Sequence, residues 1–400
     1  MLSGFSLEVP KQTFFGPGER RQLRALARSF GERVFLVSGS TWFEKSGRVA
    51  EFLKLLEGLR VEHHSCPAGE PTTTSIETAL EAARRFEPEV VVGVGGGSVL
   101  DTAKALSGLY YAHGAVCEDA ASKHSVCKDA AYQGTVARCL ASAGKASFPQ
   151  PTLPWIALPT TSGTGAEATK NAVVKLPAAG LKKSIRSAYL LAAAIIVDPE
   201  LTLDLPRAIT GMTGMDALTQ LIESYVSRKS RPIPRALVRD AFPTMLRALR
   251  TLAAKPTDLQ ARAGAAYGSL ISGLALANSG LGAVHGFAAA VGGLYNVPHG
   301  YVCAAFLTPV LEVNRDLIRT DVAELLHAAG KPIRRNAVSL LVDEVSQLLD
   351  LYALKPKLRA YGVEQKAVKE IVERSTGSSM AGNPKELSEE EKETIVSSLV

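Results

Sequence analysis

A long stretch without charge constrains the fold of this sequence more than any other feature. No Asp, Glu, Lys or Arg occurs from residue 263 to residue 311, between Arg262 and Glu312. A water-exposed face of this length would carry charged side chains, so the stretch must be buried in a protein core or in lipid. Polar residues such as Asn278 and Asn296, together with many glycines, interrupt every window that a membrane span would need. We therefore predict a buried core segment and no membrane partner.

Two histidines, His285 and His299, lie inside this uncharged stretch. A buried imidazole needs a hydrogen-bonding or metal partner. Each histidine is followed by a glycine, which permits close backbone approach, and this pattern favours two ligands that face one cavity. The alternative is that both are core histidines bonded to backbone carbonyls, and the stretch alone does not separate the two interpretations.

Composition argues against several classes of protein. With 46% hydrophobic and 21% charged residues the chain can bury a large core, and its 400 residues suggest two domains. The five cysteines are odd in number and scattered, which favours reduced thiols, and the N-terminal residues lack the apolar core of a secretory signal. The net charge of +6 comes without a basic tract, which argues against a nucleic-acid partner. We therefore expect a globular, cytoplasmic protein.

The two halves of the chain differ in their hydrophobic patterning. The first half alternates short apolar β-rich runs, such as residues 90–94, with helical patterns, which is typical of an α/β domain with a mainly parallel sheet. After Pro206 the β signal fades and helical patterns continue to the C-terminus. A boundary near Asp198-Pro199 gives an α/β domain over residues 1–198 and an all-α domain over residues 199–400.

A glycine-rich turn follows the apolar run at 90–94. Between this predicted strand and a predicted helix that contains Asp101 lie Gly95, Gly96, Gly97 and Ser98. Glycines allow backbone N–H groups to approach a phosphate, and the positive end of a helix favours an anion, so the turn is a candidate pyrophosphate site. The spacing differs from G-x-G-x-x-G, and a plain tight turn is the alternative.

A second candidate loop, rich in hydroxyl groups, follows the predicted strand that begins at Trp155. Its hydroxyl side chains are Thr160, Thr161, Ser162 and Thr164. Loops at the carboxyl ends of parallel strands often contact ligands. The loop can also cap a helix, since Thr164 and Glu167 have the S/T-x-x-E spacing of a capping box.

Residues 214–225 predict a helix with an apolar stripe on one face and Asp216, Gln220 and Glu223 on the opposite face. Taken alone, such a polar face is more often solvated than functional. If the face borders a cleft, Asp216 offers a carboxylate and Gln220 an amide to whatever the two histidines bind.

Four of these segments occur in a characteristic order: Gly-Gly-Gly-Ser-Val-Leu-Asp-Thr-Ala-Lys at 95–104, Pro-Thr-Thr-Ser-Gly-Thr-Gly-Ala-Glu-Ala-Thr at 159–169, Asp-Ala-Leu-Thr at 216–219, and the segment from His285 to His299. In this order they resemble the iron-containing (group III) alcohol dehydrogenase family. The resemblance runs from about Phe14 to the C-terminus; only residues 112–150, which we expect to form a surface excursion, are unlike the family. It implies an N-terminal dinucleotide-binding domain, a C-terminal helical domain, and an active site with one divalent metal in the cleft between the domains.

The resemblance also assigns roles to individual residues. Asp216, His285 and His299 match three metal ligands and are the expected catalytic residues, with Fe²⁺ ahead of Zn²⁺ as the metal. The implied reaction is hydride transfer between a metal-bound alcohol or aldehyde and the nicotinamide, with the metal as a Lewis acid. A homodimer is expected. The residues expected to contact the cofactor, NADP or NAD, are Gly39, Gly95, Gly96, Gly97, Ser98, Asp101, Thr160, Thr161, Thr164, Asn171 and Lys182.

Two positions depart from the family pattern. Gln220 stands four residues after Asp216, where the family usually has a histidine. A glutamine carbonyl oxygen can bind a metal, although less tightly than an imidazole, so Gln220 remains a fourth candidate ligand. Ala289 stands four residues after His285, where many members carry a histidine near the substrate, and proton transfer is therefore expected to pass through the substrate hydroxyl or water.

The leading function is a metal-dependent NAD(P) alcohol dehydrogenase or aldehyde reductase. A keto-acid reductase resembling the maleylacetate reductases would use the same fold, and absence of any metal effect on its activity would favour it. Another alternative is a non-catalytic member that binds nucleotide without turnover, in which Gln220 and Ala289 replace the histidines that catalysis would need.

Cofactor choice depends on Gly39, at the end of the first predicted strand. In NAD-preferring relatives an aspartate at this position bonds the ribose hydroxyl and repels a 2′-phosphate. Its absence admits NADP(H), and the hydroxyls of Ser38, Ser40 and Thr41 can donate to the phosphate. We therefore expect NADP(H) to be accepted and preferred.

Gly39→Asp should restore discrimination against NADP(H) and leave NAD(H) use largely intact, because the new carboxylate repels the 2′-phosphate. The effect should reach about 1–3 kcal/mol. The ratio of kcat/KM for the two cofactors, compared between parent and variant, measures it. An unchanged ratio would show that residue 39 does not lie at the adenine ribose.

Overall fold

The structure is a computed structural model in which the chain forms two compact units. It describes residues 4–40, 42–112, 134–141, 152–333, 336–354 and 357–400. Most of the surface excursion expected at 112–150 lies outside these residues. The α/β unit consists of Val9–Thr160 and Ala166–Leu201, and the helical unit consists of Met1–Glu8, Thr161–Gly165 and Thr202–Val400.

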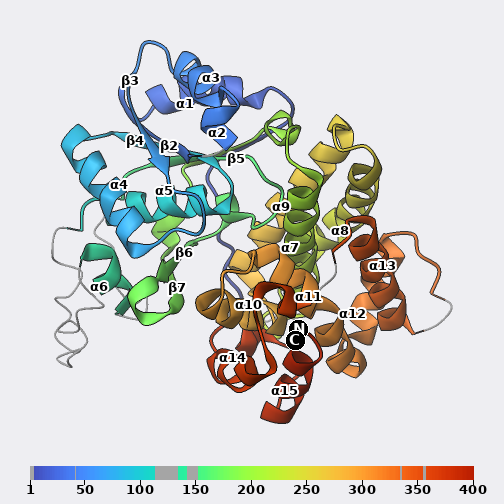
Figure 1. Cartoon of the computed structure of the whole chain (residues 1–400). Helices are drawn as coiled ribbons and strands as arrows, with labels where there is room; N and C mark the ends of the chain where they lie inside the picture. The colour runs from blue at the N-terminus through green and yellow to red at the C-terminus, as the bar shows by residue number, and fades with distance from the viewer. Residues whose placement is uncertain (1–3, 41, 113–133, 142–151, 334–335, 355–356) are drawn as a thin grey trace. The chain divides into compact units, whose positions relative to one another are not determined.

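A six-stranded parallel sheet forms the centre of the α/β unit (Figure 1), with the strand order β1-β8-β5-β4-β2-β3. The prediction of a mainly parallel sheet is confirmed. Its strands are β1 (Thr13–Phe15), β2 (Arg33–Gly39), β3 (Arg60–Cys66), β4 (Val90–Gly95), β5 (Trp155–Pro159) and β8 (Ala194–Val197). The helices of this unit are α1 (Leu23–Arg28), α2 (Trp42–Lys45), α3 (Arg48–Leu55), α4 (Thr73–Phe86), α5 (Gly97–Leu109) and α6 (Thr135–Ala141).

The central strands are buried on both faces, as their nearly continuous apolar runs require. Every residue of β4 is buried, and Val90 and Val92 share one core with Ile156 of β5. Strands of this kind suit a parallel sheet whose two faces are both covered. The register pairs Ser38 with Val94 and Gly95 with Pro159, so the carboxyl ends of β2, β4 and β5 lie side by side. Ligands of open α/β sheets bind beyond the carboxyl ends of the strands.

An antiparallel hairpin, which was not predicted from the sequence, lies between β5 and β8 along the chain. Its strands are β6 (Asn171–Leu176) and β7 (Leu181–Arg186). Helix α5 is tied to the hairpin by buried polar contacts. Asp101 Oδ2 accepts a hydrogen bond from the backbone N–H of Val173 at 2.9 Å, and the Lys104 ammonium donates to the carbonyl of Asn171 at 2.7 Å.

In its described part, the helical unit contains helices and no strands (Figure 1), which confirms the predicted all-α C-terminal half. Its α-helices are α7 (Arg207–Val226), α8 (Pro232–Ala254), α9 (Leu259–Ser279), α10 (Ala283–Leu294), α11 (His299–Val313), α12 (Arg315–Ala328), α13 (Ala337–Leu351), α14 (Val368–Arg374) and α15 (Glu389–Ser397).

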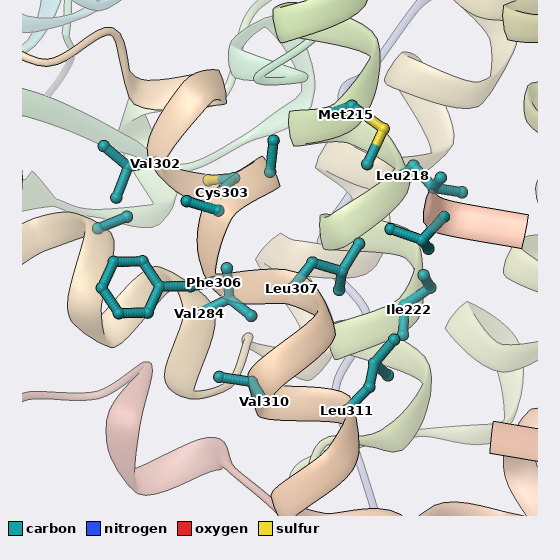
Figure 2. Close-up of a cluster of buried hydrophobic side chains, with 14 of the residues drawn as sticks. Met215, Leu218, Ile222, Val284, Val302, Cys303, Phe306, Leu307, Val310 and Leu311 are labelled. Carbon is teal, nitrogen blue, oxygen red and sulfur yellow. The ribbon is translucent and has the colours of Figure 1, made fainter. Parts of the chain in front are cut away.

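The uncharged stretch 263–311 forms most of α9, all of α10 and most of α11, and it is largely buried, as predicted. Phe287 of α10 stacks on Phe306 of α11 with ring centroids 4.7 Å apart. Figure 2 shows buried side chains of α11 beside those of α7. Among the described residues, no single helix is long and apolar enough to cross a membrane, and only α9 and α10 taken together, with a 98° bend, meet that test by length and composition.

Two glycines bring the hydroxyl-rich loop against α9. Gly165 has a φ of +59°, a conformation that side chains disfavour. A Cβ added to Gly273 would lie 2.2 Å from the carbonyl oxygen of Gly165, so the two backbones touch. This contact explains why Thr161–Gly165 belongs to the helical unit although its neighbours along the chain belong to the α/β unit.

Gly273→Ala should lower the free energy of unfolding by about 1–3 kcal/mol, because the added methyl group overlaps the backbone of the loop. Urea unfolding of parent and variant measures this change. Gly264→Ala on the same helix is the matched control: its added carbon would meet side-chain atoms at 3.2 and 3.3 Å, so the loss should be smaller. Parent-like stability of Gly273→Ala would show that the loop does not rest on α9.

Candidate metal centre and cofactor loop

Four side chains of the helical unit bring metal-binding atoms to one point. Asp216 comes from the middle of α7, His285 from the first turn of α10, His299 from the first residue of α11, and Cys303 from one turn later on α11. One donor atom from each lies within 4.8 Å of the donor atoms of the other three. Three of the side chains are buried, and that of His299 is 28% exposed. We call these residues the four-donor cluster.

The distances within the four-donor cluster are short. Asp216 Oδ1 lies 3.2 Å from Nε2 of His285 and 3.7 Å from Nε2 of His299. Cys303 Sγ lies 3.7 Å from Asp216 Oδ1, 3.7 Å from His285 Nε2 and 3.6 Å from His299 Nε2. The structure therefore brings together three of the four residues predicted as metal ligands, and adds a thiol to them.

Close helix packing sets the position of His299. A Cβ added to the next residue, Gly300, would lie 2.1 Å from the carbonyl oxygen of Met212 on α7. The first turn of α11 therefore contacts the α7 backbone directly, one turn before Asp216. Only glycine permits this approach.

Glu223 fixes the imidazole ring of His285. Its Oε2 lies 2.6 Å from His285 Nδ1, and its Oε1 accepts a hydrogen bond from the backbone N–H of Val284 at 2.7 Å. A carboxylate on one ring nitrogen of a histidine keeps the proton there and orients the other nitrogen toward a metal. Asp216, Gln220 and Glu223 are at most 4% exposed, so the alternative of a solvated polar face on this helix is wrong.

Gln220, the fourth predicted metal ligand, lies beside the four-donor cluster with its amide engaged by two neighbours. Its Nε2 donates to Asp216 Oδ1 at 3.0 Å, and its Oε1 accepts from the hydroxyl of Ser272 on α9 at 2.9 Å. The carbonyl oxygen, which is the atom predicted to bind metal, therefore faces Ser272. In this arrangement Gln220 orients the carboxylate of Asp216.

Burial and mutual contacts set the charges of the four-donor cluster. Burial favours a neutral Asp216, but the charge of His299 and a hydrogen bond with His285 hold the pKa of Asp216 below its ordinary value. Burial disfavours a charged His285, yet Cys303, Asp216 and Glu223 together raise the pKa of His285 well above its ordinary value. Burial also raises the pKa of the Cys303 thiol to about 11. Two buried carboxylates thus flank His285 and favour positive charge at this point.

Two residues of this arrangement received no role from the sequence: Cys303 was not singled out, and Glu223 was placed only on the polar face of its helix. The signal for Cys303 is its spacing from His299, since residues four apart share one face of a helix. The signal for Glu223 is its place two turns after Asp216 on the same helix.

The predicted pyrophosphate turn lies between β4 and α5. Gly95 ends the strand, Gly97 begins the helix, and no side chain caps the helix N-terminus in the described structure. A Cβ added to Gly95 would lie 2.6 Å from Cβ of Val99, so a side chain does not fit there. The first N–H groups of α5 thus have the setting expected of an anion site.

The other predicted cofactor residues have varied settings, and their roles stay predictions. Gly39 ends β2, and the N–H of Thr160 donates to the Gly95 carbonyl at 3.0 Å. Asp101 contacts Lys104 and the backbone of β6. Asn171 is the first residue of β6, and Lys182 of β7 forms an ion pair with Glu70. Thr161 and Thr164 lie in the loop on α9.

Two family models together cover most of the chain. The model described as iron-containing alcohol dehydrogenase matches residues 10–199, and that of the C-terminal part of the Fe-containing alcohol dehydrogenase family matches residues 210–400. The chain belongs to the iron-containing alcohol dehydrogenase family.

Relatives in this family are similar over nearly the whole chain. Long-chain-alcohol dehydrogenase 1 of Geobacillus thermodenitrificans is 31% identical over 92% of this chain and 90% of its own length. The NADPH-dependent butanol dehydrogenase of Clostridium saccharobutylicum is 29% identical over 97% and 96%. The crystal structure of a 1,3-propanediol oxidoreductase superposes with a TM-score of 0.86, at 28% identity and over 100% of both chains.

These likenesses confirm the predicted fold and the leading function. The chain is an NAD(P)-dependent oxidoreductase that acts on alcohols or aldehydes. The family also implies a divalent metal, and the four-donor cluster is a candidate site for it.

Glu223→Gln should lower the affinity for a divalent metal about 10- to 100-fold. Val284 N–H and His285 Nδ1 contact different oxygens of Glu223, and glutamine replaces one of these oxygens with an NH₂ group that cannot accept. Competition with a chelator for Zn²⁺ measures this affinity. Glu312→Gln, which changes an exposed carboxylate on α11, should bind like the parent. Equal affinities for the two variants would show that Glu223 does not orient His285.

Proposed function

We propose that one divalent metal ion binds to Asp216, His285 and His299 and supports the oxidation of an alcohol or the reduction of an aldehyde. The observation that carries this proposal is the convergence of a carboxylate oxygen and two imidazole nitrogens, from three helices, on one largely buried point. Oxygen and nitrogen donors of this kind suit Fe²⁺ or Zn²⁺. The buried carboxylates of Asp216 and Glu223 also fit a cation.

A divalent ion at this point would supply Lewis-acid stabilisation of negative charge on the substrate oxygen. The residues around it prepare the site. Glu223 holds the proton on Nδ1 of His285, Gln220 orients Asp216, and the apolar segments of α10 and α11 limit the access of water. Position 289 is an alanine, so no imidazole stands one turn after His285 to accept a proton, and we assign proton transfer to the substrate hydroxyl or water.

We also propose that NADP(H) is preferred to NAD(H). A Cβ added to Gly39 would meet only Val99 Cγ2, at 3.6 Å, so packing leaves room there for a side chain. Ser38 is buried with its hydroxyl 2.8 Å from His63 Nε2, which leaves Ser40 as the described hydroxyl that can reach a phosphate; Thr41 lies outside the described residues. One relative is named NADPH-dependent butanol dehydrogenase and another NAD-dependent methanol dehydrogenase, so the proposed preference rests on position 39.

A cytoplasmic homodimer completes the proposal. β1 lies at one edge of the described sheet, and edge strands can pair with a strand of a second copy. The described cysteines Cys66 and Cys303 form no disulfide, as is usual in a reducing compartment. Light scattering of the purified protein tests the dimer, and the mass of a single chain would contradict it.

His285→Ala should lose metal and activity together, because it removes one donor and leaves Asp216 and Glu223 without the imidazole between them. Metal content per chain and NAD(P)-linked turnover of a panel of alcohols and aldehydes measure both losses. His327→Ala, at an exposed position on α12, is the control and should behave like the parent. Full activity of a metal-free His285→Ala protein would refute the proposed site, and a parent enzyme indifferent to metal would favour the keto-acid reductase alternative.

A further inference from the structure

Helix α11 carries two of the four donors of the four-donor cluster. His299 and Cys303 are one turn apart, and their donor atoms lie 3.6 Å from each other. Figure 2 shows Cys303 one turn before Phe306 and Leu307 on this helix, in the part of α11 beside α7. Cys303 is fully buried, yet Sγ lies within 3.7 Å of one carboxylate oxygen and two imidazole nitrogens. A cysteine that only fills space in a core would be surrounded by carbon atoms instead.

The spacing of these atoms fits one metal ion with four protein ligands. Bonds of about 2.0–2.2 Å to nitrogen and oxygen and about 2.3 Å to sulfur, at tetrahedral angles, place donor atoms about 3.3–3.7 Å apart. Five of the six distances in the four-donor cluster lie between 3.2 and 3.7 Å, and the sixth is within 4.8 Å. The helices therefore hold the donors close to their metal-bound spacing.

Gln220 does not present a free lone pair at this point. Its carbonyl oxygen accepts from Ser272, and its amide nitrogen donates to Asp216 Oδ1. A fourth donor from α7 would require this amide to turn and break both hydrogen bonds. Cys303 Sγ already lies beside the donor atoms of Asp216, His285 and His299, and needs no such rearrangement.

We propose that Cys303 is the fourth protein ligand of the metal ion, and that its sulfur shifts the preference of the site from Fe²⁺ toward Zn²⁺. The inference rests on the proposed metal site and adds to it the ligand and the selectivity. On binding, the S–H bond breaks, a sulfur–metal bond forms and the proton passes to solvent, so no oxidant or reductant is needed. Thiolate ligands favour Zn²⁺ over harder ions that oxygen donors suit.

Cobalt provides a direct test, because Co²⁺ bound to a thiolate shows an intense sulfur-to-metal charge-transfer band in the near ultraviolet. The full-length protein is stripped with a chelator and reloaded with Co²⁺. We expect this band in the parent and in Gln220→Ala. Cys303→Ser should lose it, keep the visible ligand-field bands, and bind Co²⁺ at least tenfold more weakly. Cys66→Ser, which changes a buried free thiol of the α/β unit, should keep the band.

Selectivity is the second measurement. The ratio of Zn²⁺ to Fe²⁺ affinity, measured by anaerobic competition, should fall at least tenfold in Cys303→Ser relative to the parent. An unchanged ratio, or a charge-transfer band that survives in Cys303→Ser, would overturn the inference.

X-ray absorption of the Zn²⁺-loaded parent gives an answer even if Cys303→Ser does not fold. One sulfur at about 2.3 Å from the metal supports Cys303 as a ligand. His285→Ala should remove this metal, which assigns the sulfur-bound ion to the four-donor cluster. A shell of nitrogen and oxygen alone, with binding still dependent on His285, overturns the role of Cys303 and leaves the proposed metal site intact. A parent that binds neither Co²⁺ nor Zn²⁺ overturns both.

Discussion

The burial of two carboxylates beside His285 is the constraint on which the rest of the helical unit depends. Asp216 and Glu223 are almost fully buried on α7, in a region whose other helices carry a long uncharged stretch. An uncompensated charge in such a place costs several kcal/mol. The imidazole of His285 contacts both carboxylates and compensates them, and the same geometry suits a metal ion. The same atoms of Asp216, Glu223 and His285 therefore serve both to balance the buried charge and to suit a metal ion.

The helices that carry these atoms come close because small residues stand where they cross. Gly300 lets α11 touch the backbone of α7 beside Met212, and Gly282 leaves room for the carboxylate of Glu223 before α10 begins. Larger side chains at these places would move His285 or His299 away from Asp216. The precision of the four-donor cluster therefore comes from backbone contacts, and the apolar core around it holds those contacts in place.

Much of the fold could be predicted from the sequence, because its two halves have different hydrophobic periods. The parallel sheet and the helical second half follow from those periods. The β6–β7 hairpin was not predicted, because its strands carry lysines among their apolar residues. Asp216, His285 and His299 could be predicted from motif order and from the missing charges. Cys303 was missed, because its spacing of four residues from His299 is a weak signal: in an apolar helix a space-filling cysteine can have the same spacing. The orientation of Gln220 depends on Ser272, which lies 52 residues later in the sequence.

The close spacing of donors along the chain has a consequence for folding. His285, His299 and Cys303 all fall within the hairpin of α10 and α11, and Asp216 lies far earlier on α7. An ion bound by all four residues would cross-link α10 and α11 to each other and to α7. It would restrict the unfolded chain as a disulfide does. The free energy of metal binding then becomes part of the free energy of folding. Scarcity of metal in the cell would reduce the amount of chain that survives as folded protein, and with it the capacity for catalysis.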